Sequence, residues 1–187
     1  MYADVHDARQ NRNRIEHAQV LHPDDLTRFA NLDLTASMEP AHAVEDMVWA
    51  EDRLGPERIR GAYSWRNLRR AGASLVFNSD LPGSDWNVFY GMHAAMTRRN
   101  KERKPPNGWY TEQALTAEET VRAYSKWASF VSFTESQSGM IEAGRWADLT
   151  VMSIDPFMLE SRDPGRILDG EIVATIVQGK IVYQAGL

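Results

Sequence analysis

The sequence predicts an α/β fold in which parallel βα units come first and a β-rich tail follows. Strand-like and helix-like segments alternate from residue 14 to about residue 136. One of them, "ASLVFN" at 73–78, is short, β-rich and apolar on both faces, as a buried parallel strand should be. The last fifty residues instead have the pattern of strands alone. We therefore expect two domains, at 1–136 and 137–187.

The first βα unit follows a polar, helix-like opening at residues 1–13. Residues 14–19, "RIEHAQ", form a plausible strand that carries a histidine near its end. A helix is expected over 22–32, because Pro23 suits the first turn of a helix, acidic residues stand near its N-terminus and apolar residues recur along one side. These two elements complete one βα unit.

Two further units follow the first. The second combines a strand, the loop "EPAH" and two helices, at residues 33–38, 39–42, 43–54 and 56–72. The third combines a strand and a helix, at residues 73–78 and 88–98. In both units the strand is short and the helix pattern ends near glycine or basic residues, as helix ends commonly do.

A long loop rich in Pro, Gly and Asn is expected over 99–115, and it ends at a helix N-terminus. Thr116 can cap that helix and Glu119 can reach back to complete a capping box. Apolar residues continue at helical spacing as far as Val131. The tail contains three expected strands, the last two of which are joined by a tight turn at Gln178–Gly179, and they span 147–153, 171–178 and 180–184.

Composition excludes several kinds of partner and site. The chain carries 21 Lys+Arg against 26 Asp+Glu, a formal charge of −5, so its surface should repel nucleic-acid phosphate and anionic lipid. No run approaches the roughly 18 apolar residues that a membrane span needs. Without cysteine, any metal must be bound by histidine, carboxylate or a modified lysine. We therefore expect neither nucleic acid nor membrane as a partner.

Three polar residues stand where parallel strands end. His17 lies at the end of the first strand, His42 four residues past the second, and Asp80 two residues past the third. Taken singly, each histidine is more often structural than a ligand, and Asp80 could simply stabilise a turn. Together they are expected on one rim of the sheet, where two imidazoles and a carboxylate suit a divalent metal such as Zn2+.

The other histidines fail this test of position. His6 falls in the polar opening, His22 at a helix start and His93 in mid-helix. We expect all three to be structural or solvated.

Several segments resemble the C-terminal part of metal-dependent amidohydrolases, in the branch that contains N-substituted formamide deformylase. They are "RIEHAQ", "ASMEPAH", "NSDLP", "LTAEETVRAY" and, most specifically, "SGMIEAGRWADLTVMSIDP". The resemblance runs over nearly the whole chain. It implies a partial (β/α)8 TIM-like barrel, of which this chain supplies the last three βα units, plus the C-terminal strands of a small β-sandwich domain.

The resemblance also implies roles for the residues at the strand ends. His17 corresponds to a metal ligand, and Asp80 to an aspartate that contacts the metal and accepts a proton from the attacking water. His42 corresponds to a histidine in a motif that usually begins with glutamine, where this chain has Glu39, so we expect it to contact substrate or the transition state. Asn78 stands in place of a usual glycine, and asparagine tolerates unusual backbone angles better than most residues.

The implied reaction is hydrolysis of a small amide, formamide or cyclic amide by water that a divalent metal activates, with Zn2+ the favoured ion. Trp86, Trp109 and Tyr110 are candidates for an apolar substrate wall, although ordinary loop packing explains them equally well. The metal ligands that such enzymes carry on earlier strands, including a His-x-His pair, are absent from these 187 residues.

This absence leads us to expect the C-terminal portion of an enzyme, with little activity on its own. Three strands leave an unpaired edge, so we also expect a partner, either a second copy of the chain or the N-terminal part. The alternative is a catalytically incomplete remnant that acts only in assembly.

Overall fold

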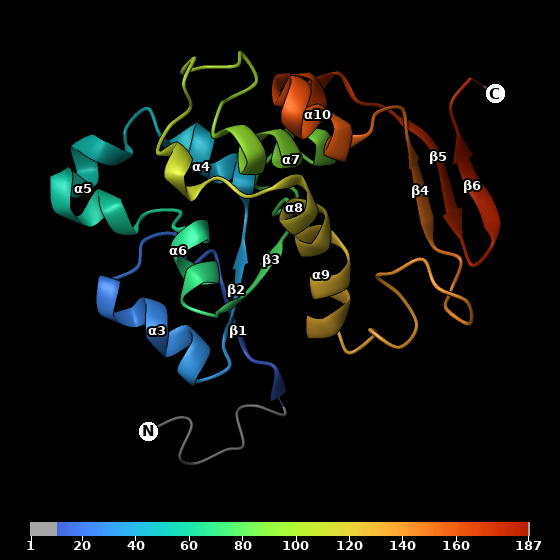
Figure 1. The fold of residues 1–187 in the computed structure, drawn as a ribbon, viewed down its shortest axis with the longest axis horizontal. Helices are drawn as coiled ribbons and strands as arrows, with labels where there is room; N and C mark the ends of the chain where they lie inside the picture. Colours follow the sequence, from blue (N-terminus) through green and yellow to red (C-terminus); the bar gives the residue numbers. More distant parts are fainter. Residues whose placement is uncertain (1–10, 187) are drawn as a thin grey trace.

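The computed structural model describes residues 11–186, which form an α/β fold with two three-stranded sheets (Figure 1). The polar helix expected at 1–13 falls largely outside this range, and His6 lies outside it. The first sheet is parallel and the second antiparallel. The α/β class is thus confirmed. The domain boundary at residue 136 falls between the two sheets and stays a prediction.

The first sheet consists of β1 (Arg14–Glu16), β2 (Thr35–Met38) and β3 (Ser74–Phe77), in the order β1-β2-β3. All four residues of β2 are buried, because helices and neighbouring strands cover the central strand on both sides. Glu16 is paired with Ser37 in the register of the sheet, and Ser37 with Val76. The three strands therefore end at nearly the same level of the sheet.

Short helices link these strands, and the first difference from the expectation is at α4. The segment 39–42 was expected to be a loop, but after α3 (Pro23–Asn31) and β2 its residues 40–42 already belong to α4 (Pro40–Asp46). The helix starts there because Pro40 occupies its first position, where a missing N–H costs nothing. The loop prediction was therefore wrong, and His42 lies in the first turn of a helix.

The two helices expected at 43–54 and 56–72 are broken into shorter pieces. Beyond α4 the chain forms α5 (Ala50–Arg58), a 3-10 turn and α6 (Trp65–Arg70). Gly55, with φ 72°, interrupts α5 immediately before a proline. This left-handed residue is incompatible with a continuous helix.

The segment after β3 agrees more closely with the sequence. It contains α7 (Val88–Thr97), a largely irregular loop, α8 (Ala117–Tyr124) and α9 (Lys126–Val131). The capping box predicted from Thr116 and Glu119 is present. The single helix expected up to Val131 breaks at Ser125, whose backbone (φ −130°, ψ −87°) is not helical.

The tail forms the antiparallel sheet β4 (Leu149–Met152), β5 (Ile172–Val177) and β6 (Lys180–Gln184). The predicted turn is confirmed, with positive φ at Gln178 and Gly179 as a tight hairpin requires. The tail is not made of strands alone, however. The helix α10 (Pro156–Arg162) and the 3-10 helix η3 (Pro164–Asp169) separate β4 from β5, and each starts with a capping aspartate followed by proline.

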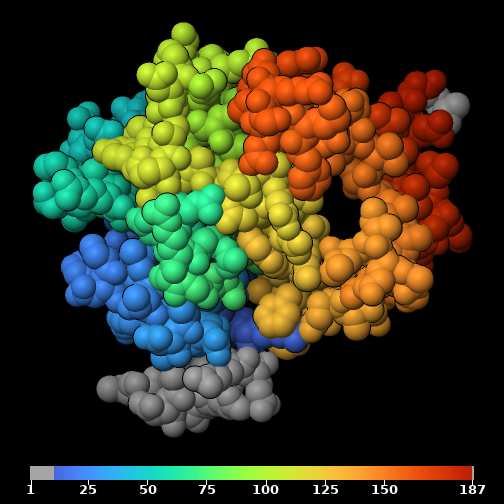
Figure 2. Space-filling view, viewed as in Figure 1, coloured from blue at the N-terminus to red at the C-terminus, as the bar shows by residue number. Residues whose placement is uncertain are grey.

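The 3-10 helix η3 holds the tail against the rest of the protein. Its Ile167 is fully buried and belongs to an apolar cluster with Phe89 and Met92 of α7. Gly170 follows, and a Cβ added there would lie 2.5 Å from the ring of Phe89. In Figure 1, α10 lies above α7 and to the left of the tail sheet, and Figure 2 shows an opening between the tail and the body below α10.

The tail sheet itself buries little of its apolar surface. Every residue of β6 is exposed, including Ile181 (62%) and Val182 (61%). Apolar surface of this kind on a monomer commonly marks an interaction site. Among the described residues, no helix is long and apolar enough to cross a membrane.

His93 of α7 is structural, as expected from its mid-helix position. Its side chain is fully buried, and its Nε2 atom lies 3.3 Å from Oγ1 of Thr97. Burial lowers the pKa of His93 to about 4. The ring is therefore neutral in the folded protein at neutral pH.

This burial predicts a loss of stability in mild acid. Between pH 6.5 and pH 4 the unfolded chain binds a proton at His93 that the folded chain does not, so stability falls as the pH decreases. Lowering the pH from 7.5 to 5 should cost about 2 kcal/mol through this residue. The free energy of unfolding of His93→Gln, measured with urea at pH 7.5 and at pH 5, should therefore fall by about 2 kcal/mol less than that of the wild type. An equal fall in the two proteins would contradict the prediction.

Candidate metal centre

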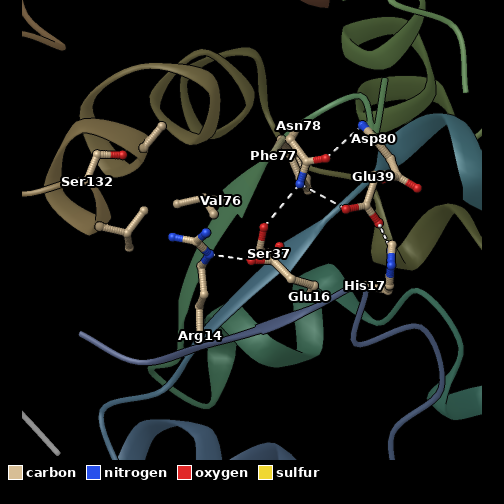
Figure 3. Close-up of a pocket in the computed structure, with 12 residues that line it drawn as sticks. Arg14, Glu16, His17, Ser37, Glu39, Val76, Phe77, Asn78, Asp80 and Ser132 are labelled. Atoms are coloured by element: carbon tan, nitrogen blue, oxygen red, sulfur yellow. Dashed lines mark hydrogen bonds and ion pairs between the residues drawn. The ribbon is translucent and has the colours of Figure 1, made fainter. Parts of the chain in front are cut away.

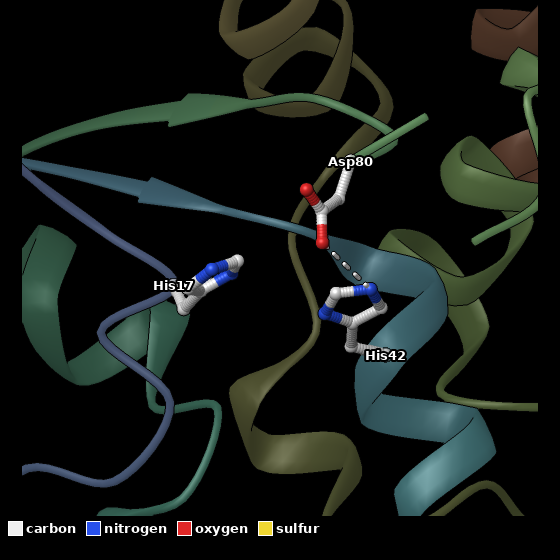
Figure 4. Close-up of side chains that lie close together, drawn as sticks. All are labelled: His17, His42 and Asp80. Atoms are coloured by element: carbon white, nitrogen blue, oxygen red, sulfur yellow. Dashed lines mark ion pairs between the residues drawn. The ribbon is translucent and has the colours of Figure 1, made fainter. Parts of the chain in front are cut away.

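The structure brings together the three residues that the sequence singles out at the strand ends. His17, His42 and Asp80 each offer one ligand atom, and these atoms all lie within 4.8 Å of one another (Figure 4). His17 directly follows β1, His42 follows β2 in the first turn of α4, and Asp80 lies in the loop after β3. They meet because parallel strands of one sheet end at the same edge.

His17 occupies a left-handed backbone position, with φ 68°, and the next residue, Ala18, does the same. Such angles are uncommon outside glycine and cluster at functional sites. They turn the chain away from the sheet and leave the imidazole at its edge. The Nδ1 atom lies 3.0 Å from Oε2 of Glu39, and this hydrogen bond raises the pKa of His17.

His42 is more buried than His17, with 16% of its side chain exposed. Its Nε2 atom lies 3.8 Å from Oδ2 of Asp80, and its Nδ1 atom 3.5 Å from Oε2 of Glu39. The ring stacks loosely on that of His17, with centroids 6.0 Å apart and an interplanar angle of 27°. His42 therefore lies between the carboxylates of Glu39 and Asp80.

Asp80 is also in the left-handed region, with φ 53°, and 44% of its side chain is exposed. Its backbone N–H donates to Oδ1 of Asn78 at 2.8 Å, which fixes the turn. Asn78, which stands where the resemblance implies glycine, is not among the positive-φ residues, and it contributes through its side-chain hydrogen bonds.

Glu39 is a member of the site that the sequence did not single out for a role. Its side chain is only 2% exposed, and it contacts the imidazoles of both His17 and His42. Its other oxygen, Oε1, accepts a hydrogen bond from Nδ2 of Asn78 at 2.9 Å (Figure 3). The available signal was its position, since it directly follows the strand that precedes His42.

The donor set fits a divalent metal. Zinc bound at about 2.0–2.1 Å in a tetrahedron has donor atoms roughly 3.4 Å apart, and since the donors here lie within 4.8 Å of one another, no pair needs to approach by more than about 1.4 Å. Two imidazoles and a carboxylate are favourable Zn2+ ligands, and three protein ligands leave a fourth position for water or substrate. His17 and Asp80 line a cavity of about 420 Å³ that runs along the sheet edge to α9 (Figure 3).

The candidate aromatic wall is only partly near this site. Trp86, with 73% exposure, lines a second cavity of about 280 Å³ that also touches Asn78. Trp109, by contrast, is buried, its indole donates to Glu51, and Tyr110 packs on it edge to face at 5.1 Å. Trp109 and Tyr110 are thus explained by loop packing.

The remaining described histidine, His22, is a helix cap. Its Nδ1 accepts a hydrogen bond from the backbone N–H of Asp24 at 3.3 Å. The structural interpretation of His22 therefore agrees with its environment.

A model of the amidohydrolase family matches residues 1–183. The chain belongs to this family. It is 29% identical over 172 residues to the protein YtcJ of Bacillus subtilis, a match that covers 92% of the chain and 32% of YtcJ. It is 26% identical over 176 residues to N-substituted formamide deformylase of Arthrobacter pascens, which covers 91% of the chain and 31% of that enzyme.

A solved structure supports the same assignment. An uncharacterised metal-dependent hydrolase from Pyrococcus horikoshii OT3 superimposes with a TM-score of 0.69 at 26% identity, over 81% of the chain and 31% of that protein. The resemblance to metal-dependent amidohydrolases is thereby confirmed. The chain spans about a third of the length of these relatives.

Proposed function

We propose that this chain is the part of a metal-dependent hydrolase that binds a divalent ion and transfers the proton during cleavage of a carbon–nitrogen bond. The observation that carries the proposal is the convergence of His17, His42 and Asp80. Family membership supports the hydrolase class. The similarity to a relative named N-substituted formamide deformylase supports a small amide, formamide or cyclic amide as substrate.

The parallel sheet fits the last three βα units of a (β/α)8 barrel. Its strands lie side by side in sequence order, and the candidate ligands follow their carboxyl ends, as in barrel enzymes. Arg14 and Glu16 alternate along β1 on the face that opens into the larger cavity, together with Ser37 and Val76. We assign this face to the barrel interior and the tail sheet to the β-sandwich domain.

In this function each residue has a distinct task. A bound divalent metal supplies a Lewis acid that acidifies water and polarises a carbonyl. His17 and Asp80 hold the ion, and Asp80 accepts the proton of the attacking water and passes it to the leaving nitrogen. His42 faces the oxygen on which negative charge develops. Zn2+ is the favoured ion, because nitrogen and carboxylate donors match its preference.

The smaller cavity supplies room for the substituent of the substrate. It adjoins the loop that carries Asp80 and is lined in part by Trp86, Val88 and Ala41. These side chains favour an apolar substituent over a charged one. The larger cavity, which contains the ligands, then receives the amide group.

Zinc retention tests the metal site. After dialysis the chain should retain Zn2+ measurable by elemental analysis, and His17→Ala should lose most of it. His22→Ala is the matched control, because His22 caps a helix away from the site and should leave zinc binding unchanged. His42→Ala separates the two possible tasks of His42, since a ligand would be needed for retention whereas a group that contacts the substrate would not. A wild-type chain without zinc would favour the assembly remnant.

Asp80→Asn tests proton transfer. Asparagine keeps the shape of the side chain but cannot accept a proton, so kcat for amide hydrolysis should fall by about 10²–10⁴-fold in any zinc-loaded preparation of the chain that hydrolyses the amide. Zinc content is measured in the same samples. Hydrolysis that persists in zinc-loaded Asp80→Asn would remove Asp80 from the proton-transfer role.

We further propose that the chain works with a partner polypeptide, either the rest of such a hydrolase or a second copy of itself. The exposed apolar residues of β6 support this, as does the short parallel sheet, whose outer strand β1 carries the exposed Ile15. An open sheet edge and an apolar sheet face both favour association with another chain.

Sedimentation velocity tests the partner. The chain alone should sediment as a dimer or larger species, and Ile181→Lys should shift it toward monomer by placing a charge on the tail sheet. Val48→Lys, at a residue 74% exposed between α4 and α5, is the control and should leave the distribution unchanged. A wild-type chain that remains monomeric at high concentration would contradict association with itself. Binding of a separately produced N-terminal part would then identify the other partner.

A further inference from the structure

One hydrogen-bond chain, centred on the buried Glu39, connects the candidate ligands Asp80 and His17. It starts at the backbone N–H of Asp80, which donates to Oδ1 of Asn78 at 2.8 Å. Nδ2 of Asn78 donates to Oε1 of Glu39 at 2.9 Å. Oε2 of Glu39 then lies 3.0 Å from Nδ1 of His17. Figure 3 shows these contacts in one row along the ends of the three strands.

The donors and acceptors of this hydrogen-bond chain can be arranged in only one direction. Because a backbone N–H can only donate, Asn78 must turn its oxygen toward Asp80 and its NH2 group toward Glu39. Both oxygens of an ionised carboxylate only accept, so Glu39 accepts from Asn78 with one oxygen and from His17 with the other. The proton of the neutral His17 ring is therefore on Nδ1. Its Nε2 atom keeps a free lone pair.

We propose that Glu39 and Asn78 act together as positioning residues that fix the tautomer and orientation of His17 for metal binding through Nε2. This inference rests on the proposed metal site. A ligand histidine commonly donates its second N–H to a carboxylate, which orients the ring and increases its basicity. Here the carboxylate is itself held by an amide that also sets the turn of the second candidate ligand, Asp80.

The burial of Glu39 supports a dedicated role. A carboxylate that is 98% buried loses its hydration and is retained only where hydrogen bonds and charges compensate it. In the described part of the chain, the imidazoles of His17 and His42 lie 3.0 and 3.5 Å from its Oε2 atom, and Asn78 donates to its Oε1 atom. The structure places the side chains of Glu39 and Asn78 in direct contact through the hydrogen bond from Nδ2 to Oε1.

Glutamine at position 39 would break the hydrogen-bond chain between Asp80 and His17. If its oxygen accepts from His17, its NH2 group faces the NH2 group of Asn78, and two donors meet at hydrogen-bond distance. If the amide turns the other way, its NH2 group faces Nδ1 of His17 and stabilises the opposite tautomer, with the proton on Nε2. Either result weakens metal binding through Nε2.

A double variant can restore the hydrogen-bond chain by exchanging the carboxylate at position 39 with the amide at position 78. In Glu39→Gln with Asn78→Asp, the new aspartate accepts from the N–H of Asp80 and from the NH2 group of Gln at position 39, whose oxygen accepts from His17. Ser37, which now accepts from Asn78, can donate its hydroxyl proton instead. The net charge of the site is unchanged. Asn78→Asp alone places the carboxylates of residues 39 and 78 at contact distance, so that no hydrogen bond can form between them.

The experiment measures zinc affinity by competition with a chelator, and the His17 tautomer by ¹H–¹⁵N NMR of the metal-free chain at a pH where the ring is neutral. Each single variant should bind Zn2+ about 10–100-fold more weakly, as loss of such partners typically does, and the double variant should recover most of the affinity. Glu39→Gln should lose the fixed Nδ1–H tautomer and the double variant should regain it. Circular dichroism verifies that each variant folds.

Glu119→Gln is the matched control. Glu119 is a half-buried carboxylate that accepts hydrogen bonds from the guanidinium of Arg66 and the backbone N–H of Thr116, and it lies in α8 outside the cavity. Its variant should unfold at a lower temperature but bind zinc like the wild type. Two results would overturn the inference. One is a folded Glu39→Gln variant that binds zinc with wild-type affinity, and the other is a double variant whose loss of zinc affinity equals the sum of the losses in the two single variants. A wild type that binds no zinc but shows the Nδ1–H tautomer, lost in Glu39→Gln, would contradict the metal site and leave the positioning pair supported.

Discussion

The architecture of the site depends on the parallel register of three short strands. Pairing of Glu16 with Ser37, and of Ser37 with Val76, brings three chain segments to the same level at one sheet edge. A shift of one residue in either pairing would reverse the faces on which alternate side chains point. The candidate ligands then leave the sheet through left-handed residues or a helix start, so their geometry follows from backbone hydrogen bonding more than from contacts among themselves.

The parts of the fold that the sequence predicts are those governed by local rules. The apolar strand at 73–78, the Thr116 capping box and the hairpin turn at Gln178 each depend on a few adjacent residues, and all are present. The proximity of His17, His42 and Asp80 was also predictable, because the ends of parallel strands converge whatever their separation along the chain. Position relative to predicted strands was the informative signal.

The parts that the sequence missed depend on competition between signals or on contacts distant in the chain. Gly55 and Ser125 interrupt patterns that look continuously helical, because backbone angles at single residues are invisible to periodicity. The start of α10 has a clear capping signal in Asp155 and Pro156, but the neighbouring segments have strand patterns, and the sequence therefore predicted strands alone in the tail. The position of Glu39 after a predicted strand could have drawn attention to it, but its contact with Asn78 could not be predicted, since the two residues are distant in sequence and adjacent only in the folded chain.

The attachment of the tail through Ile167 has a consequence for the loop that carries Asp80. Ile167 packs on α7, and α7 begins directly after the loop that carries Asp80. Proteolytic trimming that removed η3 would uncover the apolar side of α7 at Phe89 and Met92 and free the start of the helix that anchors this loop. An intact C-terminus therefore helps to hold the helix that follows the Asp80 loop, although the tail contributes no ligand of its own to the three-residue cluster.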